Sequence, residues 1–199
     1  MPIPASTRNR RADSVIHSAL FTASCRILVR PTKRPTFRDQ EDPLSTPEAF
    51  PRITPFLWFD SNAEEAVDFY LSVFKNSRRI GELASVDEIQ GPVGSVLTIW
   101  FEVDGQQLVA LNGGPNFKFT EAISLVVNCG SQEEIDEYWA KLTEGGTEIQ
   151  CGWLKDKFGL CWQVVPVNIA ELLKHPKAFQ AMLGMKKLIV AELEQAAQP

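Results

Sequence analysis

An internal duplication constrains the fold of this chain more than any other feature of the sequence. A short apolar strand is expected at Phe56–Phe59, and the pattern S-x-x-E that begins at Ser61 predicts a capped helix directly after it. The same order returns with the apolar run Ile123–Val127 and a second S-x-x-E that begins at Ser131. Apolar residues at helical spacing follow each cap. The chain is therefore expected to contain one supersecondary unit twice.

Further strands are expected after each helix, which makes the order of each repeat β-α-β-β-β. Gly and Asp residues at the turns separate these strands. The sequence predicts an α+β fold, in which paired βαβββ modules form a curved mixed sheet with a cleft. The expected strands are Arg79–Val86, Ser95–Val103 and Gln106–Leu111 in the first repeat, and Thr147–Leu154 and Leu160–Val165 in the second.

The folded domain is expected to span residues 53–199. The first repeat covers about 53–115, the second covers about 117–166, and one C-terminal helix covers about 168–196. That helix is expected because apolar residues recur along the segment at helical spacing. Its predicted apolar side consists of Phe179, Met182, Leu183, Leu188, Ile189 and Leu193.

Residues 1–50 differ from the rest of the chain in charge. They hold 8 Lys/Arg and 5 Asp/Glu, about +3, so the remaining residues hold 20 − 8 = 12 basic and 25 − 5 = 20 acidic side chains, about −8. We expect a disordered basic, proline-containing extension, and a cytoplasmic location for the protein. An organelle-targeting peptide is the alternative, since such peptides are rich in Arg and Ser and poor in acids.

Composition also bears on partners and on the redox state. An acidic domain repels phosphate backbones, so nucleic acid is not an expected partner. No apolar run approaches the roughly 18–20 residues that span a bilayer, so no membrane partner is expected. The four cysteines form no C-x-x-C pair and are expected to be free thiols; a Cys151–Cys161 disulfide across a hairpin is the alternative.

Strand alternation predicts which face of each sheet is open. In residues 96–103, Leu97, Ile99, Phe101 and Val103 share an apolar face that a helix is expected to cover. The opposite face carries aromatic and polar side chains, which is typical of a small-molecule cleft. Trp162 is expected in the core. The predicted ligand-binding residues are Trp58, Thr98, Trp100, Asn112, Ser124, Trp153 and Gln163. For the tryptophans, the alternative to ligand binding is packing in the core. For Asn112 and Gln163, the alternative is a structural hydrogen-bonded pair.

Several ordered motifs across residues 53–195 resemble one protein family. Together they are similar to the PhnB-like branch of the vicinal oxygen chelate superfamily, which includes glyoxalases, bleomycin-resistance proteins and ring-cleaving dioxygenases. This branch is often labelled a 3-demethylubiquinone-9 3-methyltransferase domain. The motifs are Pro55–Asp60, Ala63–Ala66, Phe69-Tyr70, Ala110–Pro115, Phe117–Ala122, Cys151–Asp156 and Ala181–Leu188.

The resemblance implies four metal-ligand positions, which fall near Thr54, Asn112, Ala122 and Gln163. None is His or Glu, and neutral side chains are weak ligands for Zn²⁺, Ni²⁺ or Fe²⁺. The chain's two histidines, His17 and His175, do not complete a quartet. We therefore expect no bound metal and no other cofactor. The glycines that follow Asn112 lead into a proline-containing loop and not into a helix, so an S-adenosylmethionine site of the Rossmann type is not expected.

Three functions remain open at this level. The first is a metal-free protein that binds a compact, partly aromatic small molecule. The second is an enzyme, either a divergent lyase or isomerase with an unusual metal or the transferase that the family label names. The third is a scaffold that acts by dimerisation, and a homodimer is expected because paired βαβββ proteins commonly dimerise.

Overall fold

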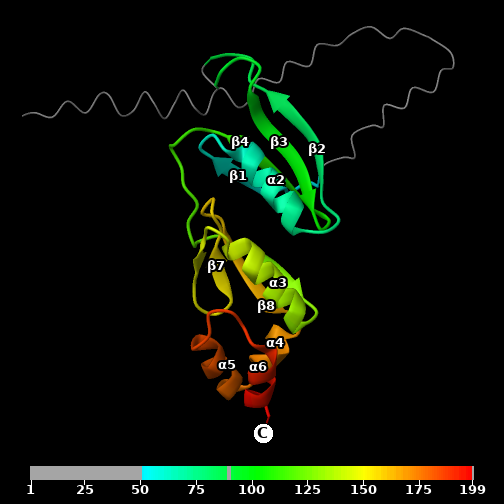
Figure 1. The fold of residues 1–199 in the computed structure, drawn as a ribbon, viewed down its shortest axis with the longest axis vertical. Coiled ribbons are helices and arrows are strands. Elements are labelled where there is room, and N and C mark those ends of the chain that lie inside the picture. The colour runs from blue at the N-terminus through cyan, green and yellow to red at the C-terminus, as the bar shows by residue number, and fades with distance from the viewer. Residues whose placement is uncertain (1–50, 89–90, 199) are drawn as a thin grey trace, which may run out of the picture. The chain divides into compact units, whose positions relative to one another are not determined.

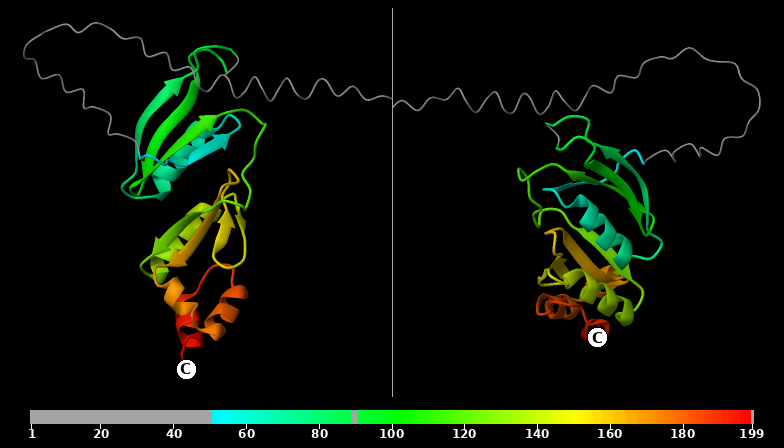
Figure 2. Two further views of the ribbon diagram at one scale, coloured as in Figure 1. Left: turned by 180° about the vertical axis from the view of Figure 1, so that it is seen from behind. Right: turned by 45° about the horizontal axis from the view of Figure 1, so that its top comes forward.

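The computed structural model describes residues 51–88 and 91–198, so the expectations for residues 1–50 lie outside the described residues. Within the described part, the chain forms two four-stranded mixed sheets and five helices. Figure 1 and Figure 2 show that one long helix lies against one face of each sheet. The predicted α+β class is confirmed, and the duplication seen in the sequence is a duplication of structure.

The first module has the strand order β1-β4-β3-β2. Strands β1 and β4 are parallel, whereas β3 is antiparallel to both β4 and β2. Helix α2 connects β1 to β2, which lie at opposite edges of the sheet, and this crossover places the helix over one face. The elements are β1 (Phe56–Phe59), α2 (Ala63–Val73), β2 (Arg78–Ala84), β3 (Val96–Val103) and β4 (Gln106–Asn112).

The second module repeats this topology with the order β5-β8-β7-β6. Strand β5 is parallel to β8, and β7 is antiparallel to both β8 and β6. Strands β6 and β7 are shorter than the single run Thr147–Leu154 that the sequence predicts, because a turn at Cys151-Gly152 interrupts it. The elements are β5 (Leu125–Cys129), α3 (Gln132–Thr143), β6 (Thr147–Glu148), β7 (Trp153–Lys155) and β8 (Cys161–Pro166).

The core lies between each helix and the sheet it covers. Ile99 and Phe101 are fully buried on the predicted helix-facing side of β3, beside Val67 of α2. In the second module Trp162 is buried among core residues, which confirms the core position expected for it. Burial of large apolar side chains contributes about 1.5–3 kcal/mol each, so these faces supply much of the stability.

The two predicted helix caps have different outcomes. At α3, the Ser131 hydroxyl accepts a 3.3 Å hydrogen bond from the Glu134 N–H, as expected. At α2, the prediction that Ser61 caps the helix is wrong. Asn62 is the N-cap residue and makes no side-chain cap bond. The first-turn N–H of Ala63 instead donates to the side chain of Asn112, 49 residues away in the sequence. At the start of α2, the side-chain amide of Asn112 thus takes the place that the sequence predicts for the Ser61 hydroxyl.

The prediction of one C-terminal helix is wrong, because this segment forms three short helices. These are α4 (Ile169–Leu172), α5 (Pro176–Leu183) and α6 (Val190–Ala196). Pro176 begins α5, since proline fits the first turn of a helix but not its interior. Leu188 and Leu193 are buried in a small second core, whereas Phe179 and Leu183 are exposed. The six apolar residues therefore do not share one face.

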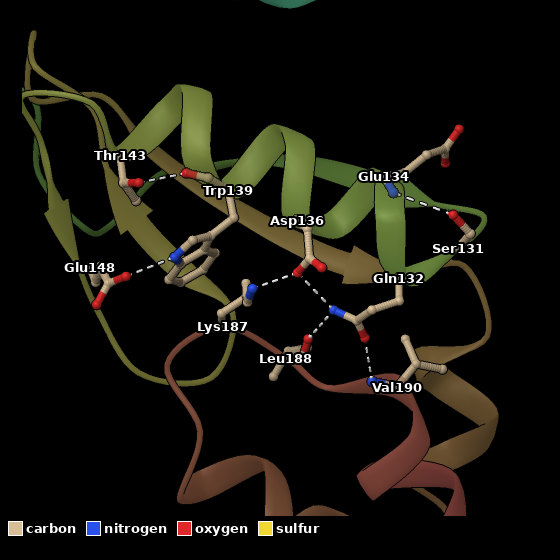
Figure 3. Close-up of polar contacts among 10 residues, drawn as sticks. All are labelled: Ser131, Gln132, Glu134, Asp136, Trp139, Thr143, Glu148, Lys187, Leu188 and Val190. Carbon is tan, nitrogen blue, oxygen red and sulfur yellow. Dashed lines mark hydrogen bonds and ion pairs between the residues drawn. The ribbon is translucent and has the colours of Figure 1, made fainter.

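The segment between α5 and α6 is bound to the second module by a polar network (Figure 3). The Gln132 side chain donates to the Leu188 carbonyl at 3.2 Å and accepts from the Val190 N–H at 2.8 Å. The Lys187 ammonium lies 2.5 Å from Asp136 Oδ1. Gln132 and Asp136 lie one turn apart on α3, so a single helix face holds the C-terminal segment against its own module.

The backbone contributes to the same attachment. The Cys151 and Gly152 N–H groups donate to the carbonyls of Met185 and Lys186, both at 2.7 Å.

Each helix in the described segments 51–88 and 91–198 is too short or too polar to cross a membrane.

The three described cysteines, Cys129, Cys151 and Cys161, are free thiols, so the alternative of a Cys151–Cys161 disulfide is not realised. Burial raises the pKa of Cys129 to about 11, with a further contribution from Glu134. Burial also raises the pKa of Cys161. Thiols with raised pKa values carry little thiolate and are poor nucleophiles.

Candidate functional site

The face of the first sheet that α2 does not cover carries three of the seven predicted ligand-binding residues. The strand register aligns Trp58 of β1 with Leu111 of β4, and Leu111 with Thr98 of β3. The adjacent row on the same face contains Trp100, which is aligned with Val109. Side chains in neighbouring strands at matched register are in reach of one another. The structure therefore groups Trp58, Thr98 and Trp100 on one surface, which we call the aromatic face.

Thr98 has an unusual environment for a polar residue. Its relative exposure is 7%, and its hydroxyl oxygen is buried without a hydrogen-bond partner in the described structure. Leaving a buried hydroxyl unpaired costs about 1–3 kcal/mol, and most such groups in native proteins have partners. The aromatic face thus contains one hydrogen-bonding group that the rest of the chain does not satisfy.

Trp58 is half-buried because the loop after β4 covers part of its indole. The indole Nε1–H donates to the Gly114 carbonyl at 2.9 Å. Phe117 approaches the ring edge-on, with centroids 4.9 Å apart. The backbone of Gly113 lies so close to the indole that an added Cβ would overlap with it. Sequence analysis noted the two glycines but not this packing role.

Asn112 has a structural role at the end of β4. Its Oδ1 accepts from the Ala63 N–H at 2.8 Å, and its Nδ2 donates to Glu64 Oε2 at 2.6 Å and to the Val96 carbonyl at 2.9 Å. These contacts engage the oxygen and both N–H groups of the amide. They join β4 to the first turn of α2 and to β3. Asn112 and Gln163 have separate partners, so the predicted Asn112–Gln163 pair is not formed.

Of the other three predicted residues, Trp153 and Gln163 lie on the second sheet, and Ser124 directly precedes β5. Gln163 of β8 donates a 2.8 Å hydrogen bond to the Ser124 hydroxyl. The register aligns Gln163 with Trp153 of β7, and both side chains are half-buried. Nearby on this sheet, Lys155 forms a 2.6 Å ion pair with Glu121. The predicted site is therefore divided into the aromatic face on one sheet and an amide-containing group on the other.

The donors at the four expected metal positions do not fit a metal centre. The Asn112 amide is engaged in capping α2, and the Thr54 hydroxyl donates to the Pro51 carbonyl at 3.1 Å. The Gln163 amide donates to Ser124, and Ala122 has no donor atom. In the described residues, no three His, Cys, Asp or Glu side chains lie close enough together to hold a metal ion. The side chains at these positions serve the fold.

Sequence analysis did not foresee a hollow of about 440 Å³ that lies beside β5. Residues 125–128 of β5 form one wall, and the aromatic rings of Phe74, Tyr138 and Trp162 contribute to the lining. The ring centroids of Phe74 and Tyr138, and those of Phe74 and Trp162, are each 5.2 Å apart. None of the seven predicted ligand-binding residues, all of which the structure describes, lines this hollow.

Comparison with known proteins places the chain in a family. The model of the 3-demethylubiquinone-9 3-methyltransferase family matches residues 51–165. A PhnB protein from Bacillus cereus with the same methyltransferase description is 34% identical, and the match covers 58% of this chain and 99% of that chain with a TM-score of 0.53. A search of curated protein sequences finds no match.

Two further solved structures show weaker likeness. A Staphylococcus aureus protein is 28% identical over 59% of this chain and 97% of its own, with a TM-score of 0.28. The fosfomycin resistance protein FosX from Listeria monocytogenes, complexed with Mn(II) and sulfate, is 16% identical over 61% of this chain and 94% of its own, with a TM-score of 0.42. The family match covers more than half of the chain and agrees with the duplicated βαβββ topology. The chain therefore belongs to the PhnB-like family that is labelled 3-demethylubiquinone-9 3-methyltransferase.

Proposed function

We propose that this protein binds a compact, partly aromatic small molecule on the aromatic face of the first sheet, without a metal ion. The observation that carries the proposal is the buried Thr98 hydroxyl, which has no partner within the described chain. Thr98 lies in the same register row as Trp58, and Trp100 lies in the adjacent row. A ligand group that reaches this oxygen would satisfy it, and the indoles would supply stacking area.

Ligand chemistry follows from these side chains. Indole rings favour flat, apolar or aromatic surfaces, and a threonine hydroxyl donates or accepts one directed hydrogen bond. The surface formed by these three side chains contains no charged group. We therefore expect a neutral ligand with an aromatic or conjugated ring and a single polar substituent. The polar residues Ser124 and Gln163 of the second module are candidates for contacts with a larger ligand.

An enzymatic function is the second candidate, because the family description names a methyltransferase. The positions equivalent to metal ligands hold Thr, Asn, Ala and Gln, which do not favour lyase or isomerase chemistry that needs a Lewis acid. Metal analysis of the purified protein separates this candidate from the first. One tightly held metal ion per chain would contradict metal-free binding. Methyl transfer from S-adenosylmethionine to a quinol would support the transferase.

Substitution of Thr98 tests the proposed site directly. The purified protein is screened against aromatic compounds by tryptophan fluorescence and thermal melting, because a ligand that binds only the native state raises stability. Thr98→Val keeps the shape of the side chain and removes the hydroxyl. We expect the variant to lose the response to ligand and to keep or increase its free energy of unfolding, since an unpaired buried group is removed.

Thr147→Val is the matched control, because Thr147 is an exposed strand residue on β6. We expect this variant to respond to ligand as the wild type does. A second variant, Trp100→Ala, is expected to lose the fluorescence response while it still unfolds cooperatively. If Thr98→Val binds as well as the wild type, the hydroxyl is not part of the site and the proposal fails.

A further inference from the structure

Two buried side-chain polar atoms lack a hydrogen-bond partner within residues 51–88 and 91–198. They are Oγ1 of Thr98 and Oε1 of Gln107. Native proteins pair most of their buried polar atoms, because a group that leaves water without a partner loses its hydration and gains nothing in return. The proposed function uses the Thr98 hydroxyl only, so the unpaired Gln107 oxygen needs an explanation of its own.

Gln107 lies on the same side of the first sheet as the aromatic face. Its neighbours on β4 at alternate positions, Leu108 and Ala110, are fully buried in the core that α2 covers, so Gln107 points to the opposite side. The register aligns Gln107 with Glu102 of β3, and Glu102 with Arg78 of β2. We call Arg78, Glu102 and Gln107 the polar row.

Trp100 occupies the row between the two unpaired atoms. Thr98, Trp100 and Glu102 are successive residues on this side of β3, so the rows of Thr98 and Gln107 are separated by roughly 13 Å along the strands. A hydrogen bond to each atom takes about 3 Å of this length. The remaining span, roughly 7 Å, fits an aromatic ring with a polar substituent at each end, and such a ring stacks on an indole.

The polar row determines which chemical group fits at its end of this span. The Arg78 guanidinium donates to Glu102 Oε2 at 3.3 Å. These two charges offset each other, so the row does not favour a charged ligand group. Gln107 Oε1 is an amide carbonyl oxygen, which accepts hydrogen bonds and does not donate them. The ligand group that pairs with it is therefore a neutral O–H or N–H.

We propose that the aromatic face and the polar row form one elongated site for a flat aromatic ligand with two polar ends. One end bonds to the Thr98 hydroxyl, the ring stacks on Trp100, and the other end donates an O–H or N–H to Gln107 Oε1. The inference rests on the proposed function and extends it, because the single polar substituent expected from Thr98 alone becomes two. The ligand class is an aromatic compound with a phenol or amide donor opposite a second hydrogen-bonding group.

Two probes of matched ring size test the need for both ends. Para-hydroxyacetanilide carries a phenol hydroxyl and an amide at opposite ends of one ring, whereas acetanilide carries the amide alone. Isothermal titration calorimetry of the full chain measures Kd for each probe. We expect para-hydroxyacetanilide to bind about tenfold more tightly, which is the effect of one additional hydrogen bond. Equal affinities for the two probes overturn the inference.

Substitution of Gln107 tests the polar row itself. Gln107→Met keeps an unbranched side chain and removes the amide. We expect it to weaken the binding of para-hydroxyacetanilide about tenfold, to the affinity of acetanilide, and to keep or raise the melting temperature, since an unpaired buried atom is removed. Gln106→Met is the matched control, because Gln106 is the exposed neighbour on the other side of β4, and it is expected to bind both probes as the wild type does.

Thr98→Val separates a failure of this inference from a failure of the proposed function. We expect it to weaken the binding of para-hydroxyacetanilide about tenfold as well. If Thr98→Val weakens binding and Gln107→Met does not, the proposed function stands and the polar row is not part of the site. If neither variant weakens binding, or if the wild type binds neither probe, both proposals fail. A melting temperature of Gln107→Met well below that of Gln106→Met shows that the amide stabilises the fold, which overturns its assignment to a ligand.

Discussion

The hydroxyl of Tyr70 on α2 donates a 2.9 Å hydrogen bond to Oδ2 of Asp156, which lies in the turn between β7 and β8. This bond joins the first module to the second across 86 positions of sequence. Asp156 is 3% exposed and also accepts from the Trp162 indole at 2.9 Å. The backbone N–H groups of Phe158 and Leu160 donate to its other oxygen. Four donors thus surround one buried carboxylate between two modules.

Tyr70→Phe is expected to lower the free energy of unfolding by about 1.5–3 kcal/mol, because the variant loses a hydrogen bond to a charged group and leaves the ring in place. Urea unfolding monitored by tryptophan fluorescence measures this change. Tyr138→Phe serves as the control, since Tyr138 is half-buried and does not contact Asp156. Equal stability of the two variants would show that the Tyr70–Asp156 bond contributes nothing.

The pH dependence of stability reports the ionisation of Asp156. Burial raises the pKa of this carboxyl in the folded protein, in spite of the opposing hydrogen bonds from Trp162 and Tyr70. The native state therefore binds the proton more tightly than the unfolded state. The contribution of Asp156 to stability is present below its unfolded pKa, about 3.9. It is lost as the pH rises through the raised folded value.

Asp156→Asn removes this titration. We expect the stability of the wild type relative to the Asn variant to fall as the pH increases above about 4, measured by urea unfolding at a series of pH values. The absolute stability of the variant also changes, because its amide places a donor near the Trp162 indole, but only the slope with pH is diagnostic. A relative stability that rises with pH would mean that the four hydrogen bonds outweigh burial.

Local patterns predicted the order of the repeated elements and most of their positions. The alternation in β3 identified Ile99 and Phe101 as helix-facing, because the period of a strand is two and one face is apolar throughout. The cap at Ser131 was also predicted, since the Glu134 N–H that donates to its hydroxyl lies only three residues away in the sequence. These features depend only on neighbours in the sequence.

Features that depend on distant residues were not predicted. The partner of Asp156 lies on α2, and the sequence analysis offered no pattern that links them. The C-terminal helix was predicted as one element, although Gln132 and Asp136 of α3 hold its middle section in a non-helical conformation. Of the candidate site, alternation in residues 96–103 placed Thr98 and Trp100 on one face, and the strand register of the structure adds Trp58 to it. The unpaired state of the Thr98 hydroxyl required the structure.

The side chain of Asn112 caps α2, so its removal is expected to lower the stability of the fold. Asn112→Ala is expected to cost about 1–3 kcal/mol in the free energy of unfolding, since it leaves the Ala63 N–H and the Val96 carbonyl without their partner. Ser61→Ala is the control and is expected to change stability by less than about 0.5 kcal/mol, because the α2 N-terminus receives no side-chain cap bond from its own N-cap region. If Ser61→Ala lowered the free energy of unfolding more than Asn112→Ala does, Ser61 would be the residue that caps α2.

The last prediction concerns the packing of Trp58 against the loop that covers it. Gly113→Ala introduces a Cβ that overlaps with the indole, so the ring must move and its bond to the Gly114 carbonyl weakens. We expect a loss of about 1–3 kcal/mol in the free energy of unfolding and a shift of the tryptophan emission to longer wavelength, because the indole becomes more exposed.

Gly81→Ala provides the matched control, since a Cβ at Gly81 meets no atom within 4 Å. It is expected to leave both the stability and the emission of Trp58 nearly unchanged. If the two alanine variants behave alike, the loop yields to the added methyl group and the position of Trp58 on the aromatic face does not depend on glycine at position 113. If only Gly113→Ala shifts the emission, the close approach of the backbone at this position fixes the ring on the aromatic face.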